Sequence, residues 1–195
     1  MTLMQRLKAA TAPAHARVEG AFALEDRLAS RDAWMDVLRR LHVFHAAWED
    51  VAARHVDEAF LAPRRKAHLL EQELEQELAR AGADAPLTKS APRFSFATDA
   101  ARAHGGMYVI EGSMLGGAVI ARRLERALGP DAPGRSFFRA YGDGLSDRWL
   151  SFGARMNALS SPAFDAGAVE GADAMFEEMR AWLSQDHVAR DVVAA

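Results

Sequence analysis

Apolar residues recur at intervals of three and four along nearly the whole chain, and this spacing is typical of helices rather than strands. The pattern is clearest in residues 31–57, where large apolar side chains form one stripe. No stretch alternates as a half-buried strand does. The spacing predicts helices over 31–57, 63–81, 96–128, 135–141, 145–159 and 165–187. We therefore expect an all-α fold of about seven or eight helices, packed as one domain over residues 1–195, whose last few residues could be disordered.

The composition narrows the chemistry that the chain can perform. Its 24 basic and 27 acidic side chains give a net charge of −3, which argues against a broad nucleic-acid-binding surface. The absence of cysteine excludes disulfides, thiolate nucleophiles, zinc fingers and thiolate-bound iron. No apolar run reaches the roughly 20 residues of a membrane span, and the N-terminus lacks the apolar segment of a signal peptide. We expect a cytoplasmic protein that binds neither nucleic acid nor membrane.

Two groups of titratable residues are best interpreted without a metal. The four glutamates between 71 and 77 lie largely outside the apolar stripe of their helix, which indicates a solvated face. His42 and His45 are three residues apart, with Glu49 one turn further on, so a metal site is an alternative to a half-buried pair. No histidine has a glutamate three residues before it, which argues against a ferritin-like di-iron centre.

Five glycines interrupt the predicted helix over 96–128: Gly105, Gly106, Gly112, Gly116 and Gly117. Each costs a helix about 0.5–1 kcal/mol relative to alanine, so they need an explanation. One interpretation is close helix–helix packing, because Gly112 and Gly116 are four apart and share a face. The other is that a flat ligand lies directly on the backbone where no Cβ intervenes. The sequence alone leaves both open.

His15 is the histidine with the most suggestive surroundings. Thr11 is a candidate N-cap for a helix that Pro13 enters in its first turn. Glu19 follows His15 by one turn, where a carboxylate can fix the tautomer of a metal-binding imidazole. Lys8 lies two turns before His15, on the same face if the helix extends that far, and could meet an anionic group of a ligand.

The segment from Leu7 to Glu19 resembles the proximal helix of haem oxygenases, with the pattern L-K-x-x-T-x-x-x-H-x-x-x-E. The segment from Tyr108 to Gly117, YVIEGSMLGG, resembles their distal helix. Residues 155–157 and the helix around Phe176 are similar to the C-terminal part of that family. The Glu-Gly-Ser-x-Leu-Gly-Gly form is closer to the bacterial branch associated with bacteriophytochromes.

The resemblance implies that haem b lies between two helices and is both cofactor and substrate. His15 would bind the iron, Glu19 would steer its imidazole, and Lys8 would meet a propionate. Gly112 and Ser113 would serve the catalytic side, where oxygen binds. The remaining implied haem contacts are Met107, Gly116, Gly117, Arg155 and Phe176.

The chain departs from the family pattern at several positions. Ser113 stands where many members carry an aspartate that organises distal water, and a hydroxyl cannot carry its charge. Met107 replaces a tyrosine of the mammalian-like branch. Trp149 and Gly153 occupy positions where that branch has basic propionate anchors, so Arg148 or Arg155 could substitute. Pro13 is unusual between Thr11 and His15.

The implied activity is oxidative cleavage of haem to biliverdin, CO and ferrous iron, using O₂. Electrons would come from a ferredoxin or flavoprotein reductase, because the chain has no flavin or nicotinamide motif. The bilin could supply a bacteriophytochrome. The main alternative is a non-catalytic haem carrier or sensor of the same fold. A thiaminase-like hydrolase would need a cysteine, and a helical interaction module would leave the glycines and the surroundings of His15 unexplained.

Overall fold

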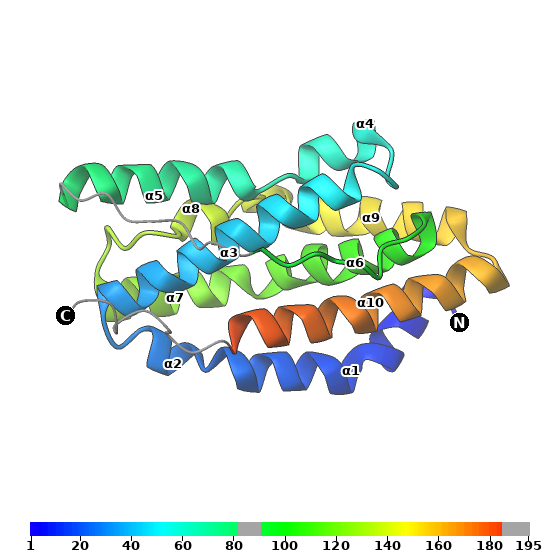
Figure 1. Cartoon of the computed structure of the whole chain (residues 1–195), viewed down its shortest axis with the longest axis horizontal. Helices are drawn as coiled ribbons and strands as arrows, with labels where there is room; N and C mark the ends of the chain where they lie inside the picture. The colour runs from blue at the N-terminus through cyan, green and yellow to red at the C-terminus, as the bar shows by residue number, and fades with distance from the viewer. Residues whose placement is uncertain (82–90, 185–195) are drawn as a thin grey trace, which may run out of the picture.

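Helices dominate the computed structural model, which describes residues 1–81 and 91–184 (Figure 1). Seven helices have 12 or more residues: α1 (Leu3–Phe22), α3 (Arg31–Ala52), α5 (Ala67–Ala81), α6 (Ala100–Ser113), α7 (Gly117–Leu128), α9 (Leu145–Leu159) and α10 (Pro162–Leu183). Short α-helical turns are α2 (Leu24–Arg27), α4 (Glu58–Leu61) and α8 (Arg135–Phe138). Three 3₁₀ turns are η1 (Ala62–Arg64), η2 (Met114–Gly116) and η3 (Gly142–Gly144). The described residues contain no strand, so the all-α prediction is confirmed.

The bounds of several predicted helices differ in the structure. The helix predicted over 31–57 begins as expected, with Ser30 accepting a hydrogen bond from the Ala33 amide, but it ends at Ala52. The helix predicted over 63–81 begins later, because Pro63 lies in η1 and α5 starts at Ala67. The segment predicted over 96–128 begins at Ala100, capped by Asp99, and divides into α6, η2 and α7. Residues 185–187 of the last predicted helix lie outside the described residues.

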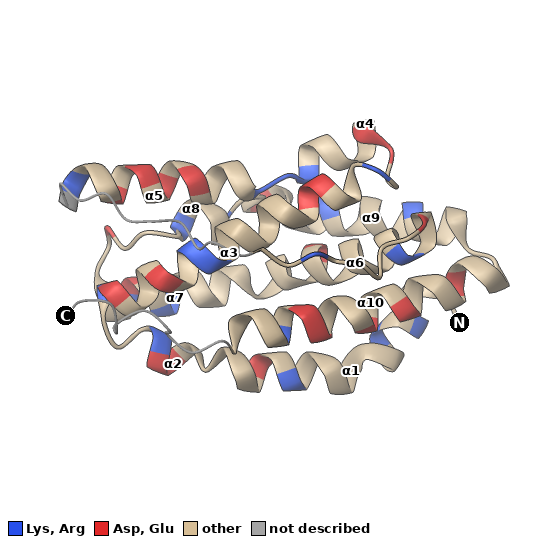
Figure 2. Ribbon diagram, in the orientation of Figure 1, with Lys and Arg blue, Asp and Glu red and all other residues tan. Residues whose placement is uncertain are grey.

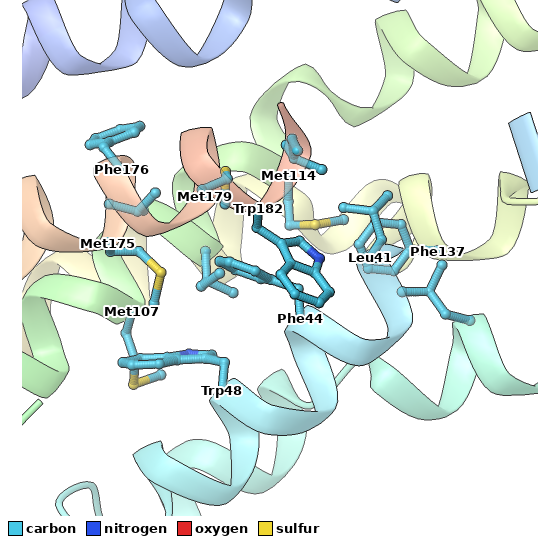
Figure 3. Packing of buried hydrophobic residues seen from close by; sticks show 14 of the residues in the cluster. Leu41, Phe44, Trp48, Met107, Met114, Phe137, Met175, Phe176, Met179 and Trp182 are labelled. Carbon is cyan, nitrogen blue, oxygen red and sulfur yellow. The ribbon is translucent and has the colours of Figure 1, made fainter. Parts of the chain in front are cut away.

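The large side chains of α3 form the centre of the core. Trp34, Leu38, Phe44 and Trp48 are each buried, as the apolar stripe predicted. Phe94, in the loop before α6, contacts the rings of both Phe44 and Trp48. Figure 3 shows this layer facing the methionines and aromatic residues of α6 and α10. The core therefore connects α3 to the two helices that carry the glycines.

α10 packs extensively against both α6 and α1, and it lies between them in the view of Figure 1. Its crossing with α6 depends on glycine. A Cβ on Gly105 would overlap the carbonyl oxygen of Ala168, and one on Gly171 would overlap that of Arg102. The two backbones are thus in direct contact, and α10 sets the relative placement of α1 and α6.

The acidic face of α5 is only partly solvated, which corrects the prediction. Glu71 and Glu75 are exposed, but Glu73 accepts hydrogen bonds from the Gly134 amide and from Ser136. Glu77 pairs with Arg31 at 2.7 Å and is largely buried. Figure 2 shows these acidic segments along α5. They join α5 to the loop before α8 and to α3. In the described part of the chain, no helix has both the length and the apolar character to span a membrane.

Candidate functional site

α1 carries the candidate proximal residues on one continuous helix. Its N-terminus is capped by Thr2, whose side chain accepts from the Gln5 amide while Gln5 accepts from the Thr2 amide. The prediction that Thr11 begins a helix is therefore wrong. Thr11 is buried in mid-helix, and its hydroxyl donates to the Leu7 carbonyl at 2.8 Å. Because the helix runs unbroken past Pro13, residues 8 and 15 lie two turns apart on one face.

His15 lies at the surface of α1 between a carboxylate and an aromatic ring. Its Nδ1 is 3.6 Å from Oε2 of Glu19, and its side chain is 56% exposed. The ring meets Phe176 of α10 edge-on, with centroids 5.7 Å apart. Lys8 is exposed and forms no ion pair with any residue that the structure describes. The structure thus brings together His15, Glu19 and Phe176.

The glycines fall into two groups with different surroundings. Gly105 packs on α10, and a Cβ on Gly106 would overlap the ring of Trp48. Gly117 packs on the Phe138 carbonyl, where a Cβ would also overlap. In contrast, a Cβ on Gly116 would meet nothing within 4 Å, and one on Gly112 would meet only the Trp149 ring at 3.6 Å. Close packing therefore explains three of the five glycines. A Cβ would fit without overlap at Gly112, against the Trp149 ring, and would meet open space at Gly116.

Ser113 and Met107, the other predicted distal residues, lie in different surroundings. Ser113 ends α6 and is exposed, and its hydroxyl donates to the Ile110 carbonyl at 2.9 Å. Met107 is 2% exposed and lies in the core with Trp48 and Met175 (Figure 3). Gly112 lies five positions after Met107, which is about 140° around the helix axis. The structure does not bring Met107 to the open glycines.

The two arginines considered as anchors for the anionic propionates lie beside aromatic rings. The guanidinium of Arg155 is 5.6 Å from the ring centroid of Phe60, in α4. That of Arg148 is 5.5 Å from the ring centroid of Tyr141. The position of α9 that faces α1 is Gly153, where a Cβ would contact the Met4 side chain at 3.6 Å.

Tyr108 links the two candidate helices, and sequence reasoning did not assign it a role. Its hydroxyl lies beside that of Thr11 in α1, and the centroids of its ring and the Trp149 ring are 5.8 Å apart. Burial raises the pKa of Tyr108, and the contact with Thr11 partly opposes this shift. The signal available in the sequence was its position one turn before Gly112. Tyr108 therefore fixes α6 against α1 at Thr11, one turn before His15.

A buried charged group at the end of α6 was also missed. Oε1 of Glu111 accepts from Nζ of Lys66 at 2.6 Å and from the Tyr141 hydroxyl at 2.8 Å. Burial lowers the pKa of Lys66, and the Glu111 carboxylate opposes that shift. Burial and the charge of Glu111 both raise the pKa of Tyr141, so its phenol stays protonated. The signal was a glutamate that interrupts an apolar stretch, YVIEG.

The alternative metal site on α3 is not formed. His45 is buried while Glu49 accepts from the amides of Lys66 and Ala67, at 2.6 and 2.9 Å. No group of three or more His, Asp or Glu suited to a metal exists among the residues that the structure describes. The pair of His42 and His45 is therefore a packing feature, with His45 more deeply buried than expected.

Comparison with known proteins identifies the family. The sequence model of the Heme oxygenase family matches residues 1–185. A crystal structure of the NO- and CO-bound heme oxygenase from Neisseria meningitidis is 24% identical, with a TM-score of 0.64 over 97% of this chain and 96% of that one. This likeness concerns the fold, and no curated protein matches the chain. Because the family match covers nearly all of the sequence, the chain belongs to the haem oxygenase family.

Proposed function

We propose that this protein cleaves haem b oxidatively to biliverdin, CO and ferrous iron, with His15 as the iron ligand. The observation that carries the proposal is an accessible imidazole, His15, beside the carboxylate of Glu19 on α1. The backbone at Gly112 and Gly116, where a Cβ would overlap nothing, supports it. When bound, haem supplies the redox chemistry, and the protein supplies binding, orientation and electrostatics. Family membership and fold support haem degradation as the reaction class.

The residues of α1 fit the proximal side of a haem. With Nδ1 of His15 directed to Glu19, its Nε2 is the nitrogen available to a metal. Phe176 packs against the same ring and limits how far the imidazole can rotate. Lys8 presents an exposed ammonium two turns away, where it would meet a propionate. Binding of iron requires a neutral His15, because a protonated imidazole has no lone pair for the metal.

The residues of the α6–α7 junction fit the opposite side. Without a Cβ, Gly112 and Gly116 allow a flat macrocycle to approach their backbone. The hydroxyl of Ser113 already donates to Ile110, so its oxygen remains available as an acceptor for a water. In this proposal, Ser113 would hold that water as a proton source on its side of the haem site, in place of an aspartate. Gly117 contributes by packing on Phe138 instead of touching haem.

Two partners complete the proposal. The reaction consumes electrons, so a ferredoxin or flavoprotein reductase would act as donor. A bacteriophytochrome would be an acceptor of the bilin, an inference that rests on the Glu111-Gly112-Ser113 form of the distal motif.

A non-catalytic haem carrier is the second candidate, and Ser113 is the observation that favours it. A hydroxyl bonded to a backbone carbonyl provides no ionisable group beside Gly112. A carrier would retain the binding residues of α1 and keep its haem intact under reducing, aerobic conditions.

One experiment tests both candidates. Haemin is added to the purified protein, to His15→Ala and to His68→Ala, an exposed histidine of α5 that serves as control. Ascorbate is then added to each haemin complex in the presence of O₂. In the wild type and in the control, we expect a histidine-ligated Soret band that decays to a biliverdin spectrum. In His15→Ala we expect no such band, while the helix content of the protein stays unchanged. A Soret band that survives ascorbate would favour the carrier, and a normal spectrum in His15→Ala would refute the ligand.

A further inference from the structure

Glu111 is the centre of a buried network at the end of α6. Its side chain is 2% exposed, and that of Lys66 is 1% exposed. Beyond Lys66 and Tyr141, its Oε2 lies 3.6 Å from Nε of Arg64. Tyr141 contacts both carboxylate oxygens, at 2.8 and 3.0 Å. Every partner is therefore held directly by one carboxylate.

The partners of Glu111 come from separate parts of the chain. Arg64 lies in η1 and Lys66 just before α5, while Tyr141 lies between α8 and η3. Each is anchored elsewhere: Lys66 donates to the Arg64 carbonyl at 2.9 Å, and Arg64 donates to the Phe60 carbonyl at 2.8 Å. The last turn of α6 is thus fixed to two distant segments through one side chain.

Two buried cations, Arg64 and Lys66, lie beside the Glu111 carboxylate. The guanidinium of Arg148 lies further out, 5.5 Å from the ring centroid of Tyr141. Glu49 accepts from the backbone amides of Lys66 and Ala67, and its charge also favours the charged form of Lys66. A buried charge is tolerated only when it is paired and hydrogen-bonded, so removing Glu111 leaves buried cations without their partner.

The chain directly after Glu111 has few other restraints. Gly112 is partly exposed, Ser113, Leu115 and Gly116 are exposed, and the α-helix gives way to η2 at Met114. Gly112 and Gly116 have no side chain with which to pack, and Gly117 packs through its backbone on the Phe138 carbonyl. Met114 is buried, and it is the side chain of η2 that anchors this segment to the core. Glu111 is therefore well placed to fix the segment from its N-terminal side.

We propose that Glu111 is a positioning residue, held by Lys66, Arg64 and Tyr141, that sets the path of residues 112–117 across the distal face of the site. The link to haem rests on the proposed function, whereas the link to the backbone of 112–117 does not. In this proposal, the network defines where the open backbone of Gly112 and Gly116 stands when haem and a diatomic ligand bind.

The first test needs no haem. Hydrogen exchange of the backbone amides of residues 112–117 is measured in the wild type, in Glu111→Gln and in Glu77→Gln. Glu77 is a matched control, because it is also a largely buried carboxylate in an ion pair, with Arg31, at a distance from α6. We expect exchange at 112–117 to accelerate at least tenfold in Glu111→Gln and not in Glu77→Gln. Equal protection at 112–117 in all three proteins would overturn the proposal.

Tyr141→Phe provides a milder variant should Glu111→Gln fold poorly. It removes one hydrogen bond from Glu111 and no charge. We expect faster exchange at the same amides, by a smaller factor than in Glu111→Gln. Faster exchange spread evenly over the whole chain would indicate a general loss of stability and would contradict a positioning role.

The second test uses the haem complex with CO and measures the C–O stretching band. Loosening of 112–117 should broaden or split the band in Glu111→Gln and in Lys66→Met alike, because the ligand then samples several surroundings. Opposite shifts of a single sharp band would show that only the charges matter, since the two variants change the charge in opposite senses. Failure of haem binding in the wild type would refute the proposed function and leave the exchange result unaffected.

Discussion

At the scale of single residues, the largest effects of pH on stability are expected from buried ionisable groups, above all His45. His45 is 3% exposed and packs against the ring of Phe137 at 5.0 Å. Its pKa falls to about 3, chiefly through burial and further through the charge of Lys66 and its neighbour His42. The imidazole is therefore neutral in the folded protein at physiological pH, although an unfolded chain would protonate it near pH 6.5.

This difference predicts an acid-sensitive stability. The unfolded state binds the extra proton between pH 6.5 and about 3, so the folded state loses stability as the pH falls through that window. Between pH 7 and pH 5 the loss through His45 is about 2 kcal/mol. We expect His45→Gln, which stays neutral, to lose about 2 kcal/mol less than the wild type over this interval, measured by urea denaturation.

The control for this measurement is His68→Gln, at an exposed position of α5. Burial also lowers the pKa of His104, which contributes equally to all three proteins. His68→Gln should follow the wild type. An identical loss in all three proteins would show that His45 does not couple folding to pH.

Which site residues the sequence could reveal depends on how far apart the partners are in the chain. Glu19 and His15 are one turn apart, so helical spacing alone predicts their contact. Glu111 is 45 residues from Lys66 and 30 from Tyr141, and no local pattern connects them. Met107, which the resemblance assigned to the site, is buried in the core, and its contact with haem stays a prediction.

At the scale of elements, the junction of α6 and α7 shows how similar residues take different roles. Gly116 and Gly117 are neighbours, but one faces open space and the other faces the Phe138 backbone. The start of α3 was predicted from its capping residue Ser30, whereas α6, capped by Asp99, and α10, capped by Ser161, begin several residues away from their predicted starts. The division at η2 was not predictable as a boundary, because it has no capping hydrogen bond from a side chain.

The two glycines should therefore respond differently to the same substitution. We expect Gly117→Leu to destabilise the haem-free protein by about 1–3 kcal/mol or more, because its side chain would be forced against backbone. Gly116→Leu should leave the unfolding temperature nearly unchanged and weaken haemin binding tenfold or more, about 1.4 kcal/mol. Thermal denaturation and haemin titration measure the two effects. Unchanged haemin affinity in Gly116→Leu would mean that haem does not lie on this backbone.

At the scale of the whole molecule, α10 determines how the two sides of the site face each other. It contacts α6 through backbone at Gly105 and Gly171, and it contacts α1 through Phe176 and the ion pair of Glu177 with Arg17 at 2.6 Å. Periodicity predicted α10 and its apolar stripe. It did not predict the crossing, because the spacing of apolar residues does not show which backbone the glycines of α10 contact.

The crossing of α10 and α6 should be the most sensitive point of the architecture to small changes. Gly171→Ala adds one methyl group, but that group would overlap the carbonyl oxygen of Arg102, so the helices must separate. Overpacking of this kind costs about 1–3 kcal/mol. For a chain of this size each kcal/mol lowers the unfolding temperature by about 2–4 °C, so we expect a fall of about 2–12 °C in calorimetry.

The matched control is Gly20→Ala in α1, where a Cβ would meet nothing within 4 Å. Alanine favours a helix over glycine by about 0.5–1 kcal/mol, so the same substitution should stabilise the protein slightly there. Because α10 also places α1, Gly171→Ala should displace His15 relative to Gly116 and weaken haemin binding, whereas Gly20→Ala should not. Equal unfolding temperatures in the two variants would mean that the crossing tolerates separation, and that α10 does not set the distance between the two sides of the site.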